Sequence, residues 1–436
     1  MHFEDLGLAP DLVRAVADQG YTTPTPIQKK AVPIVLDGHD LLAAAQTGTG
    51  KTGAFALPML QRLAFVGRAR SRQARALVLA PTRELALQVY ESVCAYARHL
   101  DLNCAVVFGG VKLPPQIRAL QPGVDLLVAT PGRLLDLSNQ GAVHFDDLEV
   151  LVLDEADRML DMGFIHDLRR IVDRLPKERQ TLMFSATFSQ DIRRLASQFL
   201  DNPRQVEVAP ANTATELVEQ IAYHVDREQK TPLLLHLLRE RQWERVLVFT
   251  RTKHGANRLA RRLEKEGFKT APIHGNKSQN ARQRALEDFK AGRLQVLVAT
   301  DIAARGLDIE QLPEVVNYDL PAVAEDYVHR IGRTGRAGST GRSHSLVSAE
   351  DEPLLRAIEK LIGRRISALE VPGFTRPAPQ PAEQAAPAKA RSRRRNRSNA
   401  SRRGAGGARS GGRSSGKGGG QKNATAANGP RARLSA

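Results

Sequence analysis

The chain has 436 residues, 42% of them hydrophobic, which is too long for one ordinary core and predicts two domains with further segments. Two cysteines, Cys94 and Cys104, are too few for a disulfide framework or a cysteine-based zinc site, and are typical of a reducing compartment. The net charge of +17 indicates a polyanionic partner, and the lack of a leader pattern or a long apolar run predicts a soluble, cytoplasmic protein.

The first 28 residues contain a short amphipathic helix and then a proline-rich turn. The helix is expected over 10–19, where Gly20 stops it, and the prolines between Tyr21 and Gln28 enforce a rigid, extended backbone. A glutamine amide can bind the N6/N7 edge of adenine, and an aromatic ring can stack on the base. A helix-capping loop is the alternative interpretation of the same residues.

A glycine-rich loop follows the apolar stretch 41–45 and precedes an apolar-periodic run, so its context is strand, loop, helix. Its glycines let backbone N–H groups face phosphate oxygens at a helix N-terminus. Lys51 would reach the β- and γ-phosphates, and the Thr52 hydroxyl would ligate Mg²⁺. An alanine stands where the pattern usually has its first glycine, and an ordinary glycine-rich connection is the alternative. The loop consists of Ala45, Gln46, Thr47, Gly48, Thr49, Gly50, Lys51 and Thr52.

Apolar, β-prone runs alternate with helical stretches through the first half, with polar or glycine-rich residues after each run. This alternation predicts an α/β fold with a doubly wound parallel sheet. The runs are 77–80, 104–108, 125–129, 150–153 and 181–184.

The run 150–153 ends in two adjacent carboxylates, Asp154 and Glu155. Ligands bind at the carboxyl ends of parallel strands, where acids can hold Mg²⁺ and orient a water. Acids that merely suit the dipole of a following helix are the alternative. Paired with the glycine-rich loop, the two carboxylates predict a P-loop NTPase.

The periodicity lapses at 209–215, where a linker is expected, and the second half repeats the α/β pattern without a phosphate loop. Two arginines three apart, Arg333 and Arg336, suit guanidinium groups converging on a phosphate. A solvated helix face is the other possibility, but the glycines around them favour a loop that presents both. The strands expected here are 245–249, 271–273, 295–299 and 315–318.

The C-terminal tail carries most of the charge. Residues 376–436 hold 15 Lys and Arg against one acid, which gives +14 of the total of +17. Rich in Pro, Ala, Arg, Ser and Gly and free of aromatic residues, the tail is expected to be disordered and to attract phosphates without stacking on bases. A plain solvated tail is the alternative.

The ordered motifs together closely resemble the DEAD-box family of ATP-dependent RNA helicases in superfamily 2, over about residues 1–372. An alanine at the first position of the loop is normal in that family. The opening residues and the basic tail look most like its bacterial RhlE-type branch. The resemblance implies two tandem RecA-like domains, and the expected division is 1–28 Q-motif region, 29–208 domain 1, 209–217 linker, 218–372 domain 2 and 373–436 tail.

The resemblance also implies roles for individual residues. Adenine would be read by Phe3, Tyr21 and Gln28. The catalytic residues would be Lys51, Asp154, Glu155, Arg333 and Arg336, with Gly306 and Asp308 completing the ATP site and Thr52 and Asp154 holding Mg²⁺. Ser185, Thr187 and His329 would couple hydrolysis to unwinding. The RNA contacts would be Pro81, Thr82, Arg83, Gly109, Gly110, Thr130, Pro131, Gly132 and Arg133 in domain 1, and Arg251, His274, Gly275, Gln279, Arg282, Thr300 and Asp301 in domain 2.

The function implied is ATP-driven, sequence-nonspecific RNA duplex unwinding or RNP remodelling, with ribosomal precursors or the RNA-degrading machinery as possible partners. Two rivals remain open. One is an ATP-gated RNA clamp or scaffold with little unwinding, which RNA-stimulated turnover would separate from a helicase. The other is a DNA helicase of the same superfamily, which the Q motif and Ser185-Ala186-Thr187 together disfavour.

Overall fold

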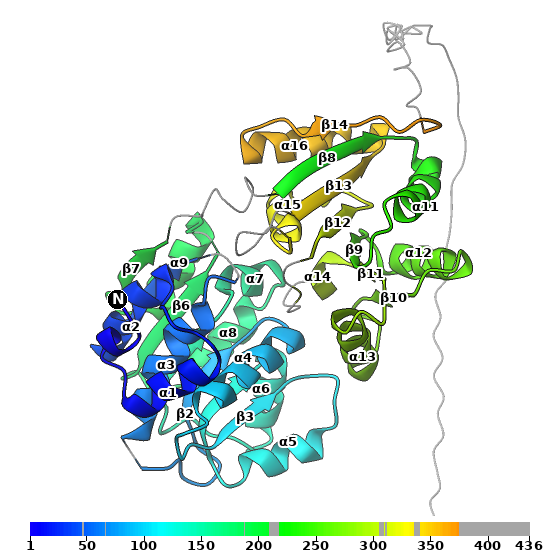
Figure 1. The fold of residues 1–436 in the computed structure, drawn as a ribbon. Coiled ribbons are helices and arrows are strands. Elements are labelled where there is room, and N and C mark those ends of the chain that lie inside the picture. The colour runs from blue at the N-terminus through cyan, green and yellow to red at the C-terminus, as the bar shows by residue number, and fades with distance from the viewer. Residues whose placement is uncertain are drawn as a thin grey trace, which may run out of the picture. The chain divides into compact units, whose positions relative to one another are not determined.

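The computed structural model describes residues 1–45, 48–65, 67–186, 188–208, 218–304, 309, 312–334 and 341–374, all within one compact unit of the chain. Two seven-stranded parallel sheets organise these residues, one in domain 1 (1–208) and one in domain 2 (218–374) (Figure 1). The predicted α/β fold with two tandem RecA-like domains is therefore confirmed. The expected linker 209–217 and the tail beyond Phe374 lie outside the described residues.

Domain 1 has the strand order β3-β4-β2-β5-β6-β1-β7. Its strands are β1 (Leu41–Ala44), β2 (Ala74–Leu79), β3 (Cys104–Val107), β4 (Val124–Ala129), β5 (Val150–Leu153), β6 (Gln180–Ser185) and β7 (Arg204–Glu207). Its helices are η1 (Glu4–Leu6), α1 (Pro10–Asp18), α2 (Pro26–Leu36), α3 (Lys51–Ala64), α4 (Arg83–Tyr96), α5 (Leu113–Leu120), α6 (Pro131–Asn139), α7 (Ala156–Asp161), α8 (Ile165–Val172) and α9 (Gln190–Phe199).

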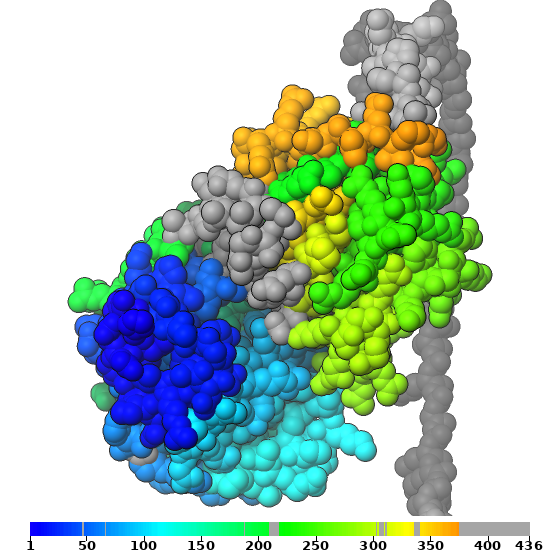
Figure 2. Space-filling model, in the orientation of Figure 1, coloured from blue at the N-terminus to red at the C-terminus, as the bar shows by residue number. Residues whose placement is uncertain are grey.

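Helices cover both faces of this sheet, because its central strands are apolar on both sides. The α1–α4 helices pack on one face and α6–α9 on the other, so that β5 is fully buried. The predicted Q-motif region 1–28 is part of this fold, since Phe3 and Leu12 join the first core. In the space-filling view this N-terminal segment, in dark blue, covers one side of domain 1 (Figure 2).

Domain 2 has the strand order β10-β11-β9-β12-β13-β8-β14. Its strands are β8 (Val218–His224), β9 (Val246–Phe249), β10 (Thr270–Ile273), β11 (Val296–Ala299), β12 (Glu314–Asn317), β13 (Gly341–Val347) and β14 (Ser367–Ala368). Its helices are η2 (Arg227–Gln229), α11 (Lys230–Glu240), α12 (Lys253–Lys265), α13 (Gln279–Lys290), α14 (Asp301–Ala304), α15 (Ala324–Ile331), η3 (Ala349–Asp351) and α16 (Glu352–Ile362). The α11 and α12 helices cover one face, and α13 to α16 the other (Figure 1).

Two features of the fold differ from the sequence-based expectation. Strands β7, β8, β13 and β14 were not expected, because they carry polar residues where a buried parallel strand is usually apolar; His344 in β13, for example, is fully buried. The packed residues also continue two positions beyond the predicted end of domain 2 at residue 372. Phe374 packs on the domain 2 core and against the His236 ring, with 5.4 Å between ring centroids.

Candidate active site

The glycine-rich loop brings an unpaired lysine to the end of β1. Gly48 and Gly50 adopt left-handed φ angles of 80° and 89°, and a Cβ on Gly50 would lie 2.7 Å from the Gln28 side chain, so glycine is required there. The α3 helix begins at Lys51, which is 7% exposed, and its Nζ has no hydrogen-bond partner among the described residues. A buried, unpaired ammonium at a helix N-terminus suits a phosphate ligand. Gln46 and Thr47 lie outside the described residues.

The two carboxylates of the predicted motif stand at the end of β5, as expected. Glu155 has a left-handed φ of 52°, which is uncommon for a residue with a side chain and typical of functional turns. Burial raises the pKa of Asp154 to about 6, although the nearby Lys51 charge opposes the rise. A cation beside a buried carboxylate stabilises its ionised form, so Asp154 and the Thr52 hydroxyl fit an ion that prefers oxygen ligands, such as Mg²⁺.

Glu155 remains the more acidic of the pair. Burial opposes its ionisation, but the positive charges of Arg158, Lys51 and Arg333 outweigh burial and lower the pKa of Glu155. Arg158 Nη1 lies 3.4 Å from Glu155 Oε2, and both side chains are buried. Glu155 is therefore a buried, ionised carboxylate, as required of a group that orients a water.

Residues predicted to act on the phosphates also meet this centre from domain 2. Arg333, directly after α15, is only 5% exposed, so it does not belong to a solvated helix face. Burial and then the Arg158 charge lower the pKa of His329 to about 4, which keeps this imidazole neutral at pH 7. Arg336, Gly306 and Asp308 lie outside the described residues.

The carboxylate turn is tied to the predicted coupling motif. One oxygen of Asp157, Oδ2, accepts a hydrogen bond from the Ala186 backbone N–H at 3.0 Å, and Oδ1 accepts one from the Arg158 N–H. Ser185 is fully buried at the end of β6. A movement of the turn after β5 is therefore transmitted to the turn after β6, and the reverse, through a direct hydrogen bond. Thr187 lies outside the described residues.

The predicted adenine readers occupy different environments. The Gln28 side chain is buried, and its Oε1 accepts from the Thr25 backbone N–H at 2.9 Å while its Nε2 donates to the Gly50 carbonyl at 3.0 Å. Gln28 thus joins the N-terminus of α2 to the phosphate loop, as the helix-capping alternative anticipated. Tyr21 is 55% exposed, and Phe3 is buried in the domain 1 core.

The domain 1 residues predicted to contact RNA cluster after β2, β3 and β4. Thr82 caps α4 by accepting from the Leu85 N–H, and the Arg83 guanidinium contacts the Gly110 backbone region. Arg133, in the first turn of α6, donates to the Val111 carbonyl at 3.2 Å. Carboxyl ends of parallel strands meet at one edge of a sheet, so these residues share one surface. Pro81 precedes α4, Gly109 lies beside Arg83, and Thr130, Pro131 and Gly132 open α6.

The domain 2 residues of this set are held by partners that the sequence did not indicate. Gln279 Nε2 donates to Glu84 Oε1 at 2.9 Å, and Arg282 Nη2 lies 3.0 Å from Glu84 Oε2, with both ionic side chains less than 10% exposed. Asp301 forms two bonds of 2.6 and 2.7 Å with Arg330. Glu84 and Arg330 were therefore missed. The one signal in the sequence was that Glu84 directly follows Arg83 and Arg330 directly follows His329, both of which are predicted site residues.

The remaining predicted residues of domain 2 lie at the carboxyl ends of its strands. His274, after β10, is hydrogen-bonded through Nε2 to Asn257 at 3.0 Å, and burial with nearby positive charges lowers its pKa. Arg251 follows β9, and its backbone N–H donates to Asp319. Gly275 is exposed, and Thr300 directly follows β11. In the described part of the chain, no helix is long and apolar enough to cross a membrane.

A parallel sheet that places a phosphate-loop lysine beside two strand-end carboxylates, followed by a second sheet of the same kind, defines a nucleotide-binding protein with tandem RecA-like domains. Family models match both parts: "DEAD/DEAH box helicase" over residues 25–195 and "Helicase conserved C-terminal domain" over 229–338. The chain belongs to the DEAD-box helicase family.

Individual relatives agree with this assignment. The chain is 44% identical over 371 residues to the ATP-dependent RNA helicase RhlB of Pseudomonas syringae pv. tomato, covering 84% of this chain and 94% of the relative. It is 43% identical to the DEAD-box ATP-dependent RNA helicase CshA of Streptococcus pneumoniae, covering 85% and 70%. The structure of S. cerevisiae Dbp5 bound to RNA and ADP BeF3 matches with a TM-score of 0.75 and 34% identity, covering 85% and 95%. The RhlE-type branch stays a prediction.

Proposed function

We propose that this protein is an ATP-dependent RNA helicase that separates short RNA duplexes or remodels RNA–protein complexes without sequence preference. The observation that carries the proposal is Lys51, a buried ammonium without a hydrogen-bond partner among the described residues, at the start of α3 and close enough to shift the pKa of both Asp154 and Glu155. The names of RhlB and CshA, and the RNA and nucleotide in the Dbp5 structure, support the same activity.

In this proposal the phosphates of ATP lie on the N-terminus of α3. Lys51 contributes a positive charge to the β- and γ-phosphates, and the loop contributes backbone N–H donors. A bound Mg²⁺, held by Asp154 and the Thr52 hydroxyl, would neutralise part of the phosphate charge. The Gln28 amide has two donors and two acceptor lone pairs. One donor and one lone pair are used inside the protein, so one of each remains for adenine, with Tyr21 and Phe3 as the expected aromatic partners.

Hydrolysis needs a group that orients water and a group that stabilises the charge of the transferred phosphoryl. Glu155, ionised and turned out of β5 by its left-handed backbone, suits the first role. Arg333, and Arg336 by resemblance, suit the second, as arginine fingers supplied by domain 2 of the same chain, each worth roughly 10³–10⁵ in rate. His329 is neutral at pH 7, so it can accept as well as donate a hydrogen bond near Asp157 and Glu155.

RNA would lie across the residues that follow the strands of both domains. Arg83, Arg133, Arg251 and Arg282 offer guanidinium donors to phosphates, which position a strand without reading its bases. Because Glu84 of domain 1 already joins Gln279 and Arg282 of domain 2, RNA and ATP should favour the same arrangement of the domains and strengthen each other's binding. We place this activity in the cytoplasm, in line with the cysteine content, and propose the basic tail as an additional RNA tether.

The proposal is tested by ATP hydrolysis and strand separation measured together on a short RNA duplex with a single-stranded overhang. RNA should stimulate hydrolysis and release the shorter strand, and a DNA duplex of the same sequence should do neither. Glu155→Gln should bind ATP with near-parent affinity yet lose both activities, because only water orientation is removed. RNA-stimulated hydrolysis without strand release would favour the clamp, and equal stimulation by DNA would overturn the RNA assignment.

A further inference from the structure

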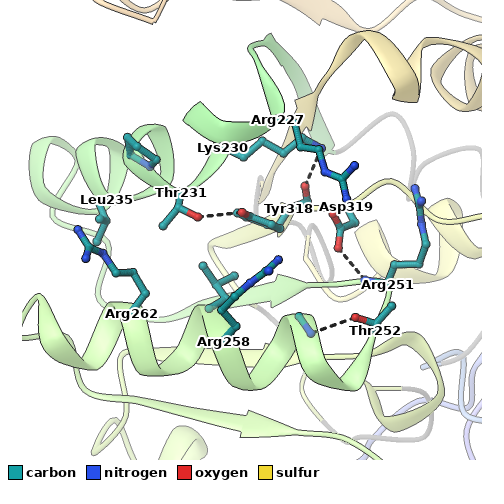
Figure 3. Close-up of a pocket in the computed structure, with 13 residues that line it drawn as sticks. Arg227, Lys230, Thr231, Leu235, Arg251, Thr252, Arg258, Arg262, Tyr318 and Asp319 are labelled. Carbon is teal, nitrogen blue, oxygen red and sulfur yellow. Dashed lines mark hydrogen bonds between the residues drawn. The ribbon is translucent and has the colours of Figure 1, made fainter.

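A basic pocket of about 500 Å³ lies in domain 2, between α11 and α12 (Figure 3). Its walls come from the N-terminal half of α11, from the stretch 255–262 of α12, and from the residues after β9 and β12. It lies on the α11/α12 face of the second sheet and includes none of the residues assigned to ATP. Only Arg251 is shared with the residues assigned to RNA.

Positive charge dominates the lining. Five cationic side chains, Arg227, Lys230, Arg251, Arg258 and Arg262, face one acid, Asp319. Lys230 is buried and already bonded to Asp351 at 2.6 Å and to the Tyr318 carbonyl, so it fixes the wall and is not free to bind a ligand. Arg227 pairs with Glu350 at 3.2 Å and Arg251 with Asp351 at 3.3 Å, so Arg258 and Arg262 supply most of the charge that a ligand would meet.

Arg258 is the arginine best placed for a ligand. It is exposed and forms no hydrogen bond or ion pair within the described residue ranges, and in Figure 3 it extends from α12 toward Tyr318. Arg262, one helical turn further along the same face, has Glu266, its own helical neighbour, as its one ion-pair partner in the described part of the chain. A solvent-exposed pair of this kind contributes little to stability, so a phosphate can compete for this guanidinium.

The pocket also has an ordered aromatic wall. The Tyr318 hydroxyl is hydrogen-bonded to Thr231 Oγ1 at 2.8 Å, and the Lys230 ammonium lies 6.0 Å from the ring centroid. The ring is thereby held in place, with Pro232 and Leu259 completing the apolar part of the lining. A fixed ring beside several guanidinium groups suits a ligand that combines phosphate with a flat, partly apolar group, as a nucleotide does.

The position of Arg251 decides between RNA and an acidic peptide. Its backbone N–H donates to Asp319 Oδ2 at 2.9 Å, so the residue predicted to contact RNA is tied directly to the rim of the pocket. A strand held at Arg251 therefore has the pocket as its neighbouring surface. An acidic peptide would use the arginines but not the aromatic wall.

We propose that the pocket between α11 and α12 binds a nucleotide of the same RNA strand, beyond the nucleotides held by the predicted motif residues. Arg258 and Arg262 contact its phosphates, and Tyr318 contacts its base or ribose. This site rests on the proposed function, because the strand must first bind across the two domains. The site extends the stretch of RNA that the protein binds and adds no catalytic step.

The test is the affinity of the full-length protein, with ADP and beryllium fluoride, for fluorescent oligouridylates of increasing length. Arg258→Glu is compared with Arg261→Glu, which makes the same charge change at an exposed position of the same helix that does not line the pocket. On the shortest strands that bind, the two variants should match. On longer strands Arg258→Glu should bind about tenfold more weakly than the control, with the salt slope reduced by roughly 0.7 per lost phosphate contact.

The outcomes separate this site from the proposed function. ATP hydrolysis without RNA should be unchanged in both variants. Equal losses for the two variants at every length, or a loss for Arg258→Glu that is the same on short and long strands, would overturn the pocket while leaving the helicase intact. Failure of the unmodified protein to bind RNA at all would instead overturn the proposed function. Polyglutamate bound by the parent and not by Arg258→Glu, with RNA affinity equal, would assign the pocket to an acidic peptide.

Discussion

Gln28, which we propose to read adenine, offers the sharpest test of how such a residue can also hold the protein together. Its amide accepts from the Thr25 N–H and donates to the Gly50 carbonyl, and the side chain is 7% exposed. Gln28→Ala removes both bonds. Gln28→Glu keeps an acceptor for Thr25 but has no N–H for Gly50 or for adenine N7. Comparing the two variants therefore separates the contribution of the hydrogen bond to Thr25 from that of the hydrogen bond to the phosphate loop.

The magnitudes follow from the two bonds. Leaving a buried donor or acceptor unpaired costs about 1–3 kcal/mol, so Gln28→Ala, which leaves two such groups unpaired, should lower the free energy of unfolding by roughly 2–6 kcal/mol. For a domain of this size that is a fall in Tm on the order of 5–20 °C. Gln28→Glu leaves the Gly50 carbonyl unpaired and also turns a buried carboxylate oxygen toward it, so it should cost more than Gln28→Ala.

The assay combines calorimetry with fluorescent ATP and GTP analogues. Both variants should lose the preference for ATP over GTP to the same degree, because neither offers adenine a full amide, while their Tm values differ. A Gln28→Ala protein whose Tm stays within about 1 °C of the parent would refute the structural role. A Gln28→Glu protein that still prefers ATP like the parent would refute the adenine contact.

Three further changes have defined outcomes. Glu84→Gln and Arg282→Gln should each reduce the factor by which ATP strengthens RNA binding. The double variant should lose no more than either single variant, because the two residues form one contact. Additive losses of this ATP–RNA coupling would contradict the prediction. Burial lowers the pKa of His344 in the folded state, so the unfolded state binds its proton more readily and stability should fall as the pH drops below about 6.5; urea midpoints at pH 7.5 and 5.5 should differ less in His344→Gln. Truncation after Phe374 should leave the maximal ATPase rate unchanged but raise the RNA concentration for half-maximal stimulation, most at low salt; coincident curves would make the tail a solvated appendage.

The sequence predicted the parts of the fold that local pattern determines. Buried parallel strands such as β5 are continuous apolar runs, and the glycines of the phosphate loop mark a turn that only they can make. Strand β13 was not predicted because Ser343, His344 and Ser345 are polar yet fully buried. Those side chains are satisfied by Asn317 and Glu314 of the adjacent strand β12, which lie 26 to 30 residues away in the sequence, so no local window reveals them.

The candidate site was predictable for a different reason. Lys51, Asp154 and Glu155 could be identified because their spacing within short segments is set by the ligand they would bind. Glu84 and Arg330 could not, because their partners, Arg282 and Asp301, lie far away in sequence and are other side chains of the protein. Motif spacing therefore predicts the groups that we propose to meet a ligand, and it does not predict the groups that hold them.

This distinction predicts which motif substitutions inactivate and which unfold the protein. Arg330 is buried and bonded to Asp301, to the Asn317 side chain and to the Asp319 carbonyl, so Arg330→Met leaves a carboxylate and two acceptors unpaired and should cost roughly 3–5 kcal/mol of stability. Lys51→Met leaves no hydrogen bond broken among the described residues, and relief of a buried, unpaired ammonium offsets the lost attraction to the carboxylates. Its free energy of unfolding should stay within about 1 kcal/mol of the parent while ATP hydrolysis is lost. Equal destabilisation by the two methionine variants, measured by urea unfolding without nucleotide, would show that Lys51 holds the fold as well as the phosphates.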